Sequence, residues 1–294
     1  MKHYSIKDIE KITGIKAHTI RIWEKRYHLV SPERTLTNIR YYNDMDMKRL
    51  LNIAILNRYG YKISNLVEMS GEEINKRVIE VTLHETDFTS LIESFIVAMI
   101  EYDEVRFEKA LNSAIIRLGF ESAITNVIYP FLAKVGILWQ TGVVIPGQEH
   151  FVTNLIRQKL ILAIDSRQAI KKNHPRRFIL FLPENEFHEI GLLFAHYLLK
   201  KYGHNTIYLG QNVPLSDVQQ LVSLKKPDFI LTSVTTSLSS GDLPEFLKQL
   251  SLILPDGQIL AGGSQIAYSD NITPANIVTI KSVKHLTDFL ESIH

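Results

Sequence analysis

The carboxyl-terminal part of the chain, residues 176–294, alternates short apolar runs with stretches of helical periodicity. A short apolar run bounded by turn residues indicates a buried strand, and strands that alternate with helices form a parallel sheet. We therefore predict a flavodoxin-like, or Rossmann-like, α/β domain with a five-stranded parallel sheet in the order 2-1-3-4-5. The expected strands are residues 178–182, 206–209, 229–234, 258–261 and 277–280, and the expected helices are residues 189–201, 216–224, 243–254 and 282–293.

Residues 186–191, which read Glu-Phe-His-Glu-Ile-Gly, form the loop after the first of these strands. In open α/β sheets, ligands bind at the carboxyl ends of the strands, where this loop is expected to lie. The imidazole of His188 can bind a metal through one nitrogen while the Glu186 carboxylate orients the other. A histidine at the start of a helix is also a common polar residue with no such role, so this loop alone leaves both interpretations open.

Length and composition place the chain among globular proteins. It has 294 residues, of which 45% are hydrophobic and 22% charged, as expected of two or three domains with sizeable cores. No apolar run reaches the roughly 18 residues that cross a bilayer, and the first residues do not resemble a signal peptide, so we expect no membrane partner. The chain has no cysteine, which excludes disulfides and thiolate metal sites and fits a cytoplasmic protein.

Charge is distributed unevenly along the chain. Residues 1–62 contain 13 Lys and Arg against 6 Asp and Glu, whereas the remaining 232 residues contain 20 against 25. The amino-terminal head therefore carries a formal charge of +7 and the rest −5, although the whole chain carries only +2. This asymmetry predicts a polyanionic partner for the head alone.

The basic head, residues 1–75, has the pattern of a winged helix-turn-helix. Ser5 can cap a helix over residues 6–13, Gly14 supplies a turn, and a second helix is expected over residues 17–27. The turn-rich stretch 31–42 predicts a β-wing, and a further helix is expected over residues 44–56. The second helix of such a motif enters the major groove of DNA. The alternative is a helical protein-interaction module with scattered basic residues.

This head resembles the MerR family of winged-helix transcription regulators, through Tyr4-Ser-Ile, Thr13-Gly-Ile, Thr19-Ile-Arg-Ile-Trp-Glu24, Arg34 and Arg40-Tyr-Tyr-Asn43. The resemblance implies a dimer on a two-fold operator in double-stranded DNA, with the second helix of each protomer in a major groove. We expect most cationic side chains to contact phosphates and a few side chains to contact bases. The candidate DNA-binding residues are His18, Thr19, Arg21, Lys25 and Arg26 on the helix and Arg34, Arg40 and Tyr41 on the wing.

A polar connector is expected over residues 70–86, followed by a four-helix bundle over residues 87–172. Apolar stripes at helical spacing mark the helices, with Asp103, Gly119 and Pro146-Gly147 in the connections between them. A bundle of this kind commonly serves dimerisation.

Trp139 and the pair Glu149-His150 flank the connection between the third and fourth helices. A tryptophan offers a broad apolar face to a nucleoside, and Glu and His can hydrogen-bond its hydroxyls and base, although a bundle tryptophan is more often a core residue. An aromatic residue, nine intervening residues and Glu-His resemble the upper cap of cobalamin-dependent photoreceptor regulators, where these residues cover the adenosyl group. Light-sensing members commonly have His directly after the Trp, where this chain has Gln140.

The loop at residues 186–191 resembles the Asp-x-His-x-x-Gly motif of base-off, His-on cobalamin-binding domains, in which the histidine coordinates cobalt from below. Ser233-Val-Thr235 stands where that family has Ser-x-Leu, and Gly262-Gly263 matches its Gly-Gly pair. In the family, these segments line a channel for the displaced nucleotide tail, which passes close to backbone and so requires small residues. This chain has Glu186 in place of Asp and Thr235 in place of Leu. The implied cofactor-binding residues are Trp139, Glu149, His150, Glu186, His188, Gly191, Ser233, Thr235, Gly262 and Gly263, with His188 as the cobalt ligand.

Together these resemblances imply a cobalamin-responsive and light-responsive transcriptional repressor rather than an enzyme. Adenosylcobalamin, or another corrinoid, would favour a homo-oligomer, a dimer or a tetramer, whose linked heads bind DNA avidly. Light would cleave the cobalt–carbon bond and remove the upper contacts. Two alternatives remain: a MerR-type regulator with a degenerate sensor domain that acts through a protein partner, and a subunit of a cobalamin-dependent enzyme. A response-regulator receiver is disfavoured, because it needs an aspartate in the region where Ser233 stands.

Overall fold

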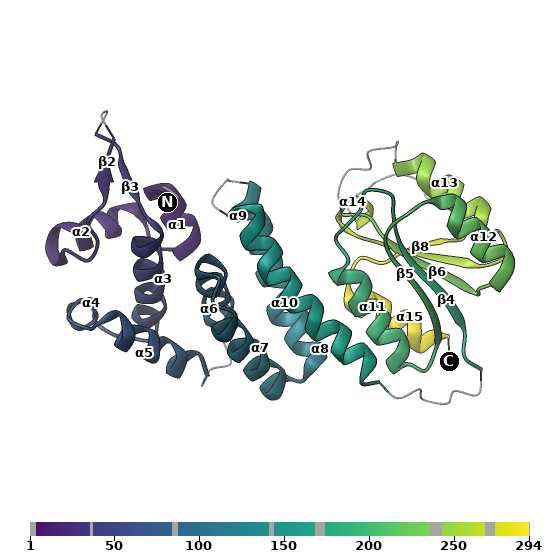
Figure 1. Cartoon of the computed structure of the whole chain (residues 1–294), viewed down its shortest axis with the longest axis horizontal. Coiled ribbons are helices and arrows are strands. Elements are labelled where there is room, and N and C mark those ends of the chain that lie inside the picture. The colour runs from purple at the N-terminus through teal and green to yellow at the C-terminus, as the bar shows by residue number, and fades with distance from the viewer. Residues whose placement is uncertain are drawn as a thin grey trace. The chain divides into compact units, whose positions relative to one another are not determined.

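The computed structural model describes residues 4–35, 38–83, 88–140, 144–167, 174–235, 243–267 and 274–293 (Figure 1). The chain divides into two compact units, Met1–Leu155 and Ile156–His294. The first unit holds the head and most of the helical bundle, and the second holds the parallel sheet.

The head begins with β1 (Tyr4–Ser5) and two short helices, α1 (Ile6–Thr13) and α2 (Ala17–Tyr27). Ser5 and Asp8 form a reciprocal capping box at the start of α1, and Gly14 ends that helix at a φ of 73°, a conformation that favours glycine. Strands β2 (Glu33–Arg34) and β3 (Arg40–Tyr42) complete a sheet in the order β1-β3-β2. These elements confirm the predicted winged helix-turn-helix.

Three helices follow the wing: α3 (Asp44–Arg58), α4 (Ile63–Leu66) and α5 (Gly71–Leu83). The polar connector predicted over residues 70–86 is therefore wrong for most of its length. Its polarity is confined to part of the helix surface, since Ile74 and Val78 are buried at the four-residue spacing of an amphipathic helix. The remainder of the expected connector, residues 84–87, lies outside the described residues.

The predicted bundle helices are α6 (Phe88–Glu101), α7 (Glu104–Leu118), a composite helical stretch and α10 (Pro146–Asp165). The composite stretch runs through α8 (Phe120–Ala123), the π-helical turn η1 (Ile124–Ile128) and α9 (Tyr129–Gln140). Phe95, Phe107 and Phe131 come from three of these helices and are fully buried, with ring centroids 4.7 to 5.9 Å apart. Their contacts form part of the bundle core.

One stretch in the described part of the chain, Phe120–Trp139, is long and apolar enough to span a bilayer by those two criteria. Phe131, Val135 and Leu138 of this stretch are buried within the first unit. Packing in the bundle therefore accounts for part of its apolar character, since 39% of the window is buried.

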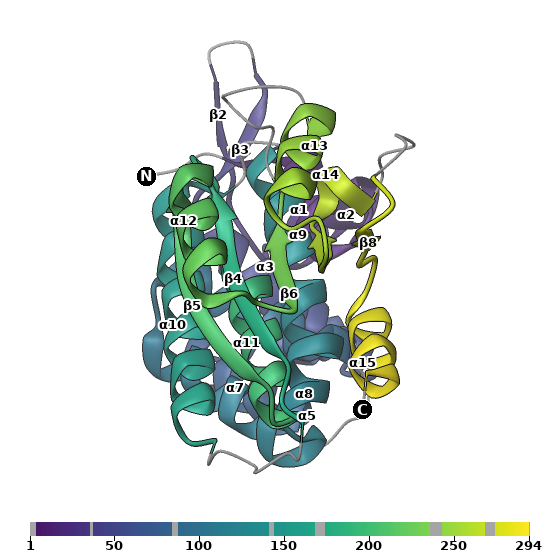
Figure 2. The same cartoon turned by 90° about the vertical axis from the view of Figure 1, so that its right-hand side faces the viewer.

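The second unit is built on β4 (Arg177–Pro183), β5 (Asn205–Val213), β6 (Phe229–Ser233), β7 (Gln258–Gly262) and β8 (Ile277–Thr279). Neighbouring strands are parallel in the order β5-β4-β6-β7-β8, which confirms the predicted order. Helices α11 (Ile190–Lys201) and α15 (Val283–Ser292) cover one face of the sheet, and α12 (Leu215–Lys225) and α13 (Leu243–Ile253) cover the other (Figure 1 and Figure 2). The short helix α14 (Ser264–Ala267) after β7 was not predicted.

Candidate functional site

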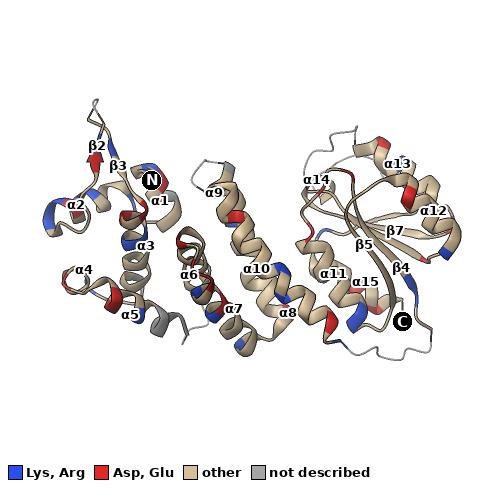
Figure 3. Ribbon diagram, viewed as in Figure 1, with Lys and Arg blue, Asp and Glu red and all other residues tan. Residues whose placement is uncertain are grey.

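Helix α2 presents a polar and cationic face to solvent. Ile20 and Trp23 are buried and hold the helix against the head, and basic residues mark α2 and the adjoining wing (Figure 3). The predicted helix residues lie away from this buried side, because His18, Arg21, Lys25 and Arg26 are exposed and Thr19 is half-buried. This face therefore has the character required of a helix that enters the major groove.

The predicted wing residues Arg40 and Tyr41 make contacts inside the head. Arg40 Nε lies 3.2 Å from the carboxylate of Glu24 on α2, which also accepts a hydrogen bond from the Tyr42 hydroxyl. The Tyr41 hydroxyl donates to Glu33 at 2.5 Å. The Arg40–Glu24 pair holds the wing against α2, a role that could not be predicted from the sequence. Contact between Arg40 and a DNA phosphate stays a prediction. The other wing residue, Arg34, is exposed.

Ile22 is a residue of the same helix that the sequence reasoning missed. Its side chain is 52% exposed, between positions 21 and 25 of the cationic face. An exposed aliphatic side chain on this helix suits contact with a thymine methyl group in the major groove. The helical spacing of positions 18, 22 and 25, which places them on one face of α2, was the available signal.

The predicted cap residues all have accessible surface in the first unit. Trp139, next to the last residue of α9, is 53% exposed and is therefore not a core residue. Glu149 and His150 occupy the first turns of α10, with Glu149 Oε2 lying 2.9 Å from His150 Nδ1. The Val144 amide donates to the Leu138 carbonyl at 3.2 Å, which brings the end of α9 and the approach to α10 together. The side chain of Gln140 lies outside the described residues.

In the second unit, the loop after β4 buries Glu186 and exposes His188. The Glu186 side chain is 1% exposed and that of His188 is 54% exposed. Glu186 Oε1 lies 2.7 Å from His188 Nδ1 and accepts the His188 backbone N–H at 2.9 Å. An ionised carboxylate at this distance favours the tautomer with its proton on Nδ1. Nε2 is therefore the ring nitrogen suited to coordinate a metal.

The same carboxylate joins the loops at the ends of two strands. Glu186 Oε2 accepts the backbone N–H of Thr235 at 2.7 Å, just beyond the end of β6. Ser233 is the register partner of Gly262 on β7, and Ser264 Oγ donates to the Thr235 carbonyl at 2.9 Å. The segments after β4, β6 and β7 that carry the predicted sheet residues are thus brought together.

The site glycines are required for different reasons. Gly263 has a φ of +94°, and a Cβ there would lie 2.2 Å from the Val234 carbonyl oxygen. The fold itself therefore requires glycine at this position, whether or not a ligand passes close to it. A Cβ at Gly191 would meet no atom within 4 Å, and one at Gly262 would lie 3.4 Å from the Ile280 carbonyl oxygen. The packing of the fold therefore does not exclude a Cβ at Gly191 or Gly262 as it does at Gly263.

A polar cluster holds Glu189, the residue next to His188, and was not predicted from the sequence. The buried Glu189 carboxylate contacts Arg157 Nε of α10 and accepts the Tyr208 hydroxyl of β5 at 2.9 Å. Burial, followed by the charge of Glu189, raises the pKa of Tyr208. The His196 ring stacks on Tyr208 with centroids 5.0 Å apart, and burial, followed by the charge of Lys200, lowers the pKa of His196 to about 4. The sequence feature that could have indicated this cluster is Glu189, an acidic residue at the start of an otherwise apolar helix.

Within the described residues, no group of three or more His, Cys, Asp or Glu side chains can hold a metal ion. A single exposed histidine backed by a carboxylate suits a metal that arrives with most of its ligands in place, as in a metal macrocycle. The chemistry of the loop therefore fits a corrinoid better than a bare ion.

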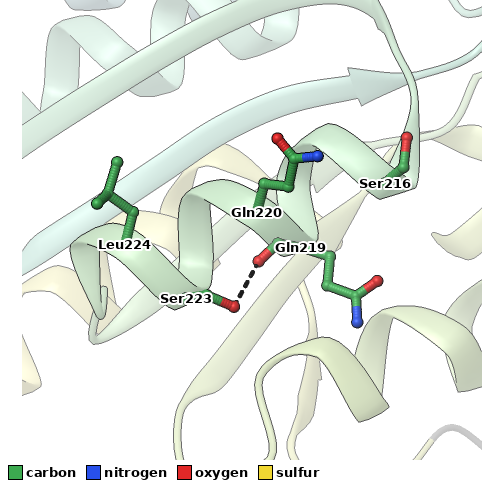
Figure 4. Close-up of a pocket in the computed structure, with 5 residues that line it drawn as sticks. All are labelled: Ser216, Gln219, Gln220, Ser223 and Leu224. Atoms are coloured by element: carbon green, nitrogen blue, oxygen red, sulfur yellow. Dashed lines mark hydrogen bonds between the residues drawn. The ribbon is translucent and has the colours of Figure 1, made fainter.

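A separate hollow of about 620 Å³ lies over the outer surface of α12. Ser223 in its lining donates to the Gln219 carbonyl of the same helix at 3.0 Å (Figure 4). None of the predicted site residues lines this hollow, whose lining is Ser216, Gln219, Gln220, Ser223 and Leu224. This hollow is therefore separate from the candidate site.

Three family models match the chain in succession. Residues 4–72 match the MerR HTH family regulatory protein, and two B12 binding domain models match residues 91–163 and 176–276. The matched ranges fall on the head, the helical bundle and the sheet.

Two curated repressors from Myxococcus xanthus are similar to the chain over most of its length. The HTH-type transcriptional repressor CarH is 30% identical over 268 residues, which are 89% of each protein. The HTH-type transcriptional repressor CarA is 24% identical over 260 residues, 88% of this chain and 85% of CarA. Among solved structures, the Methanosarcina barkeri monomethylamine corrinoid protein superposes with a TM-score of 0.55 at 16% identity, covering 74% of this chain and 99% of that protein. That likeness shows the fold alone.

Proposed function

This chain belongs to the MerR-type transcriptional repressors that carry B12-binding domains, the family of CarH, and we propose that it binds a corrinoid and adjusts its hold on operator DNA accordingly. Its head and its relatives make it a DNA-binding transcription regulator rather than an enzyme. The proposed partner is double-stranded operator DNA, and the proposed location is the cytoplasm, where a bacterial repressor meets its operator.

One observation carries the corrinoid part of the proposal. Glu186 is buried, holds Nδ1 of His188 at 2.7 Å, and leaves the exposed imidazole to present Nε2. This carboxylate–histidine pair is the arrangement that orients metal-binding histidines in proteins. We propose His188 as the lower cobalt ligand, with Gly191, Ser233, Thr235, Gly262 and Gly263 around the nucleotide tail.

We propose adenosylcobalamin as the corrinoid and light as a signal. When bound, an adenosylcobalamin supplies a cobalt–carbon bond that light can cleave. Trp139 would cover the adenosyl group with its exposed ring, and Glu149 and His150 would hydrogen-bond it. Loss of that group would remove contacts made in only one state, which is what a ligand needs in order to shift an equilibrium. The ligand-bound form would be a dimer or tetramer with linked heads.

The test uses the full-length protein prepared in the dark with adenosylcobalamin. Operator binding is measured on a DNA duplex selected by the protein from a random-sequence pool, with and without the corrinoid, before and after illumination. We expect the corrinoid to be retained and to tighten DNA binding, and light to reverse the effect. Retention without any effect on DNA would contradict the proposed corrinoid control of DNA binding, whereas a protein that retains no corrinoid would support a degenerate sensor that acts through a protein partner. No retention at all would remove the corrinoid from the proposal.

A further inference from the structure

The end of α6 and the turn that follows it, residues 100–103, contact the first turn of α10. Gln148 is buried; its Nε2 donates to the Ile100 carbonyl at 3.3 Å, and its Oε1 accepts the Ile145 amide at 3.2 Å. Both ends of the Gln148 amide are therefore used to fix the start of α10 against α6. Gln148 immediately precedes the Glu149-His150 pair, so this contact positions the proposed cap residues.

Tyr102 in the same turn lies against the same part of α10. Its ring centroid is 5.4 Å from that of Phe151, and a Cβ added at Gly147 would lie 3.4 Å from its hydroxyl. Tyr102 adopts a φ of 54°, which is uncommon for a residue with a side chain and needs support from surrounding contacts. The first turn of α10 provides that support on one side.

The region of this turn also contacts helix α3 of the DNA-binding head. The Glu101 carboxylate pairs with Lys48 of α3 and lies 3.7 Å from Arg106, which is itself buried. Arg106 donates to Asn52 of α3 at 3.3 Å, and burial lowers the pKa of Arg106. An ionic cluster with a buried member contributes little net stability, but it is sensitive to small changes in geometry because leaving the buried Arg106 charge unpaired is costly.

We propose that the α6–α7 turn couples the cap-bearing start of α10 to helix α3 of the DNA-binding head. This inference rests on the proposed corrinoid function. A change in the contacts of Glu149 and His150 would shift the first turn of α10, and Gln148 and Tyr102 would pass that shift to Glu101. Glu101 would then repack against Lys48 and Arg106 and so reorient the head. The coupling acts within one protomer, in addition to any effect of oligomer assembly.

Glu101→Gln tests this coupling, because it removes the charge that holds Lys48 and Arg106 while keeping the size of the side chain. Glu104→Gln is the matched control, since Glu104 is exposed three residues further along. Full-length proteins are compared with and without adenosylcobalamin in the dark, on the duplex selected by the wild-type protein. Light scattering reports the oligomer, the absorption spectrum reports corrinoid retention, and circular dichroism reports folding.

We expect Glu101→Gln to retain the corrinoid, the oligomer and the corrinoid-free DNA affinity. The ratio of DNA affinities with and without corrinoid should fall by about tenfold, and the reciprocal effect of DNA on corrinoid affinity should fall equally. Tyr102→Leu, which acts on the α10 side of the turn, should give the same loss and replaces Glu101→Gln if that protein does not fold. A wild-type ratio in both folded variants would overturn the coupling. A wild-type protein whose DNA affinity ignores the corrinoid would instead overturn the proposed function.

Discussion

The Glu186 carboxylate accepts the backbone N–H of Thr235 at 2.7 Å while its other oxygen contacts His188 Nδ1. This single side chain thus orients the proposed cobalt ligand and ties the loop after β4 to the segment after β6. Both functions fall on a glutamate where the related motif has an aspartate. The longer side chain is therefore part of the local geometry, and Thr235 takes part through its backbone, which any non-proline residue can supply.

Glu186→Asp should weaken corrinoid binding, because the shorter carboxylate cannot reach both His188 and the Thr235 amide without movement of the loop. We expect a loss of roughly 10- to 100-fold in affinity, the range found when a group that orients a metal ligand is altered. Spectroscopic titration in the dark measures the effect. The exposed neighbour Glu184 provides the control: if Glu184→Asp weakens binding as much as Glu186→Asp, the orienting role is wrong.

Gly263→Ala should lower the stability of the fold, whereas Gly191→Ala should lower only the affinity for the corrinoid. Alanine at Gly263 would meet the Val234 backbone at an unfavourable φ, so the free energy of unfolding should fall by about 2 kcal/mol or more. Alanine at Gly191 meets open space in a helix, so stability should stay unchanged or rise by about 0.5–1 kcal/mol. Thermal or urea unfolding of the corrinoid-free protein checks both values. Corrinoid affinity should nevertheless fall in Gly191→Ala, and an unchanged affinity would place Gly191 outside the binding site.

Arg21→Ala should mainly weaken DNA binding, whereas Arg40→Ala should mainly lower the stability of the head. Arg21 is exposed on α2, so its loss should weaken DNA binding and reduce the slope of log affinity against log salt by about 1. Arg40 pairs with the largely buried Glu24, so its loss should lower the free energy of unfolding by roughly 1–2 kcal/mol. Salt-dependent DNA binding and urea unfolding distinguish the two. An Arg40→Ala protein with normal stability and a reduced salt slope would restore Arg40 to a phosphate-binding role.

His196→Phe should reduce the loss of stability in mild acid. The folded protein holds the pKa of His196 near 4, below its ordinary value of 6.5, so the unfolded chain binds a proton in this window that the folded chain does not. The stability that depends on neutral His196 is present above pH 6.5 and is lost as the pH falls towards 4. After discounting for partial exposure, we expect the wild-type protein to lose about 1–2 kcal/mol more than the variant over this range. The control variant His285→Phe, which changes an exposed histidine, should lose as much stability as the wild-type protein. Equal losses in the wild-type protein and both variants would contradict the lowered pKa of His196 as the cause.

Elements defined by local patterns could be predicted from the sequence. The five strands and their order follow from apolar runs that alternate with helical stretches, and the first helix follows from Ser5 and Gly14. Helix α5 was missed because its abundant polar residues masked two buried positions, Ile74 and Val78, at helical spacing.

Contacts between distant segments could not be predicted. The Arg40–Glu24 pair depends on how the wing folds back on α2, and the Gln148–Ile100 contact joins residues 48 positions apart. The glycine requirement at Gly263 comes from the Val234 backbone of a neighbouring segment, so it is visible only once the strands are assembled. The motif around His188 indicated which residues belong together, whereas the distances that make them a site come from the fold.

The most direct measurement is the absorption spectrum of protein purified in the dark with adenosylcobalamin, compared between the wild-type chain and His188→Ala. The exposed His285→Ala serves as the control. We predict that the wild-type and control proteins retain the corrinoid with the spectrum of a histidine-ligated cobalt. His188→Ala should lose that spectrum and most of its affinity. A wild-type protein that retains no corrinoid, or a His188→Ala protein with an unchanged spectrum and affinity, would contradict the assignment of His188 as the cobalt ligand.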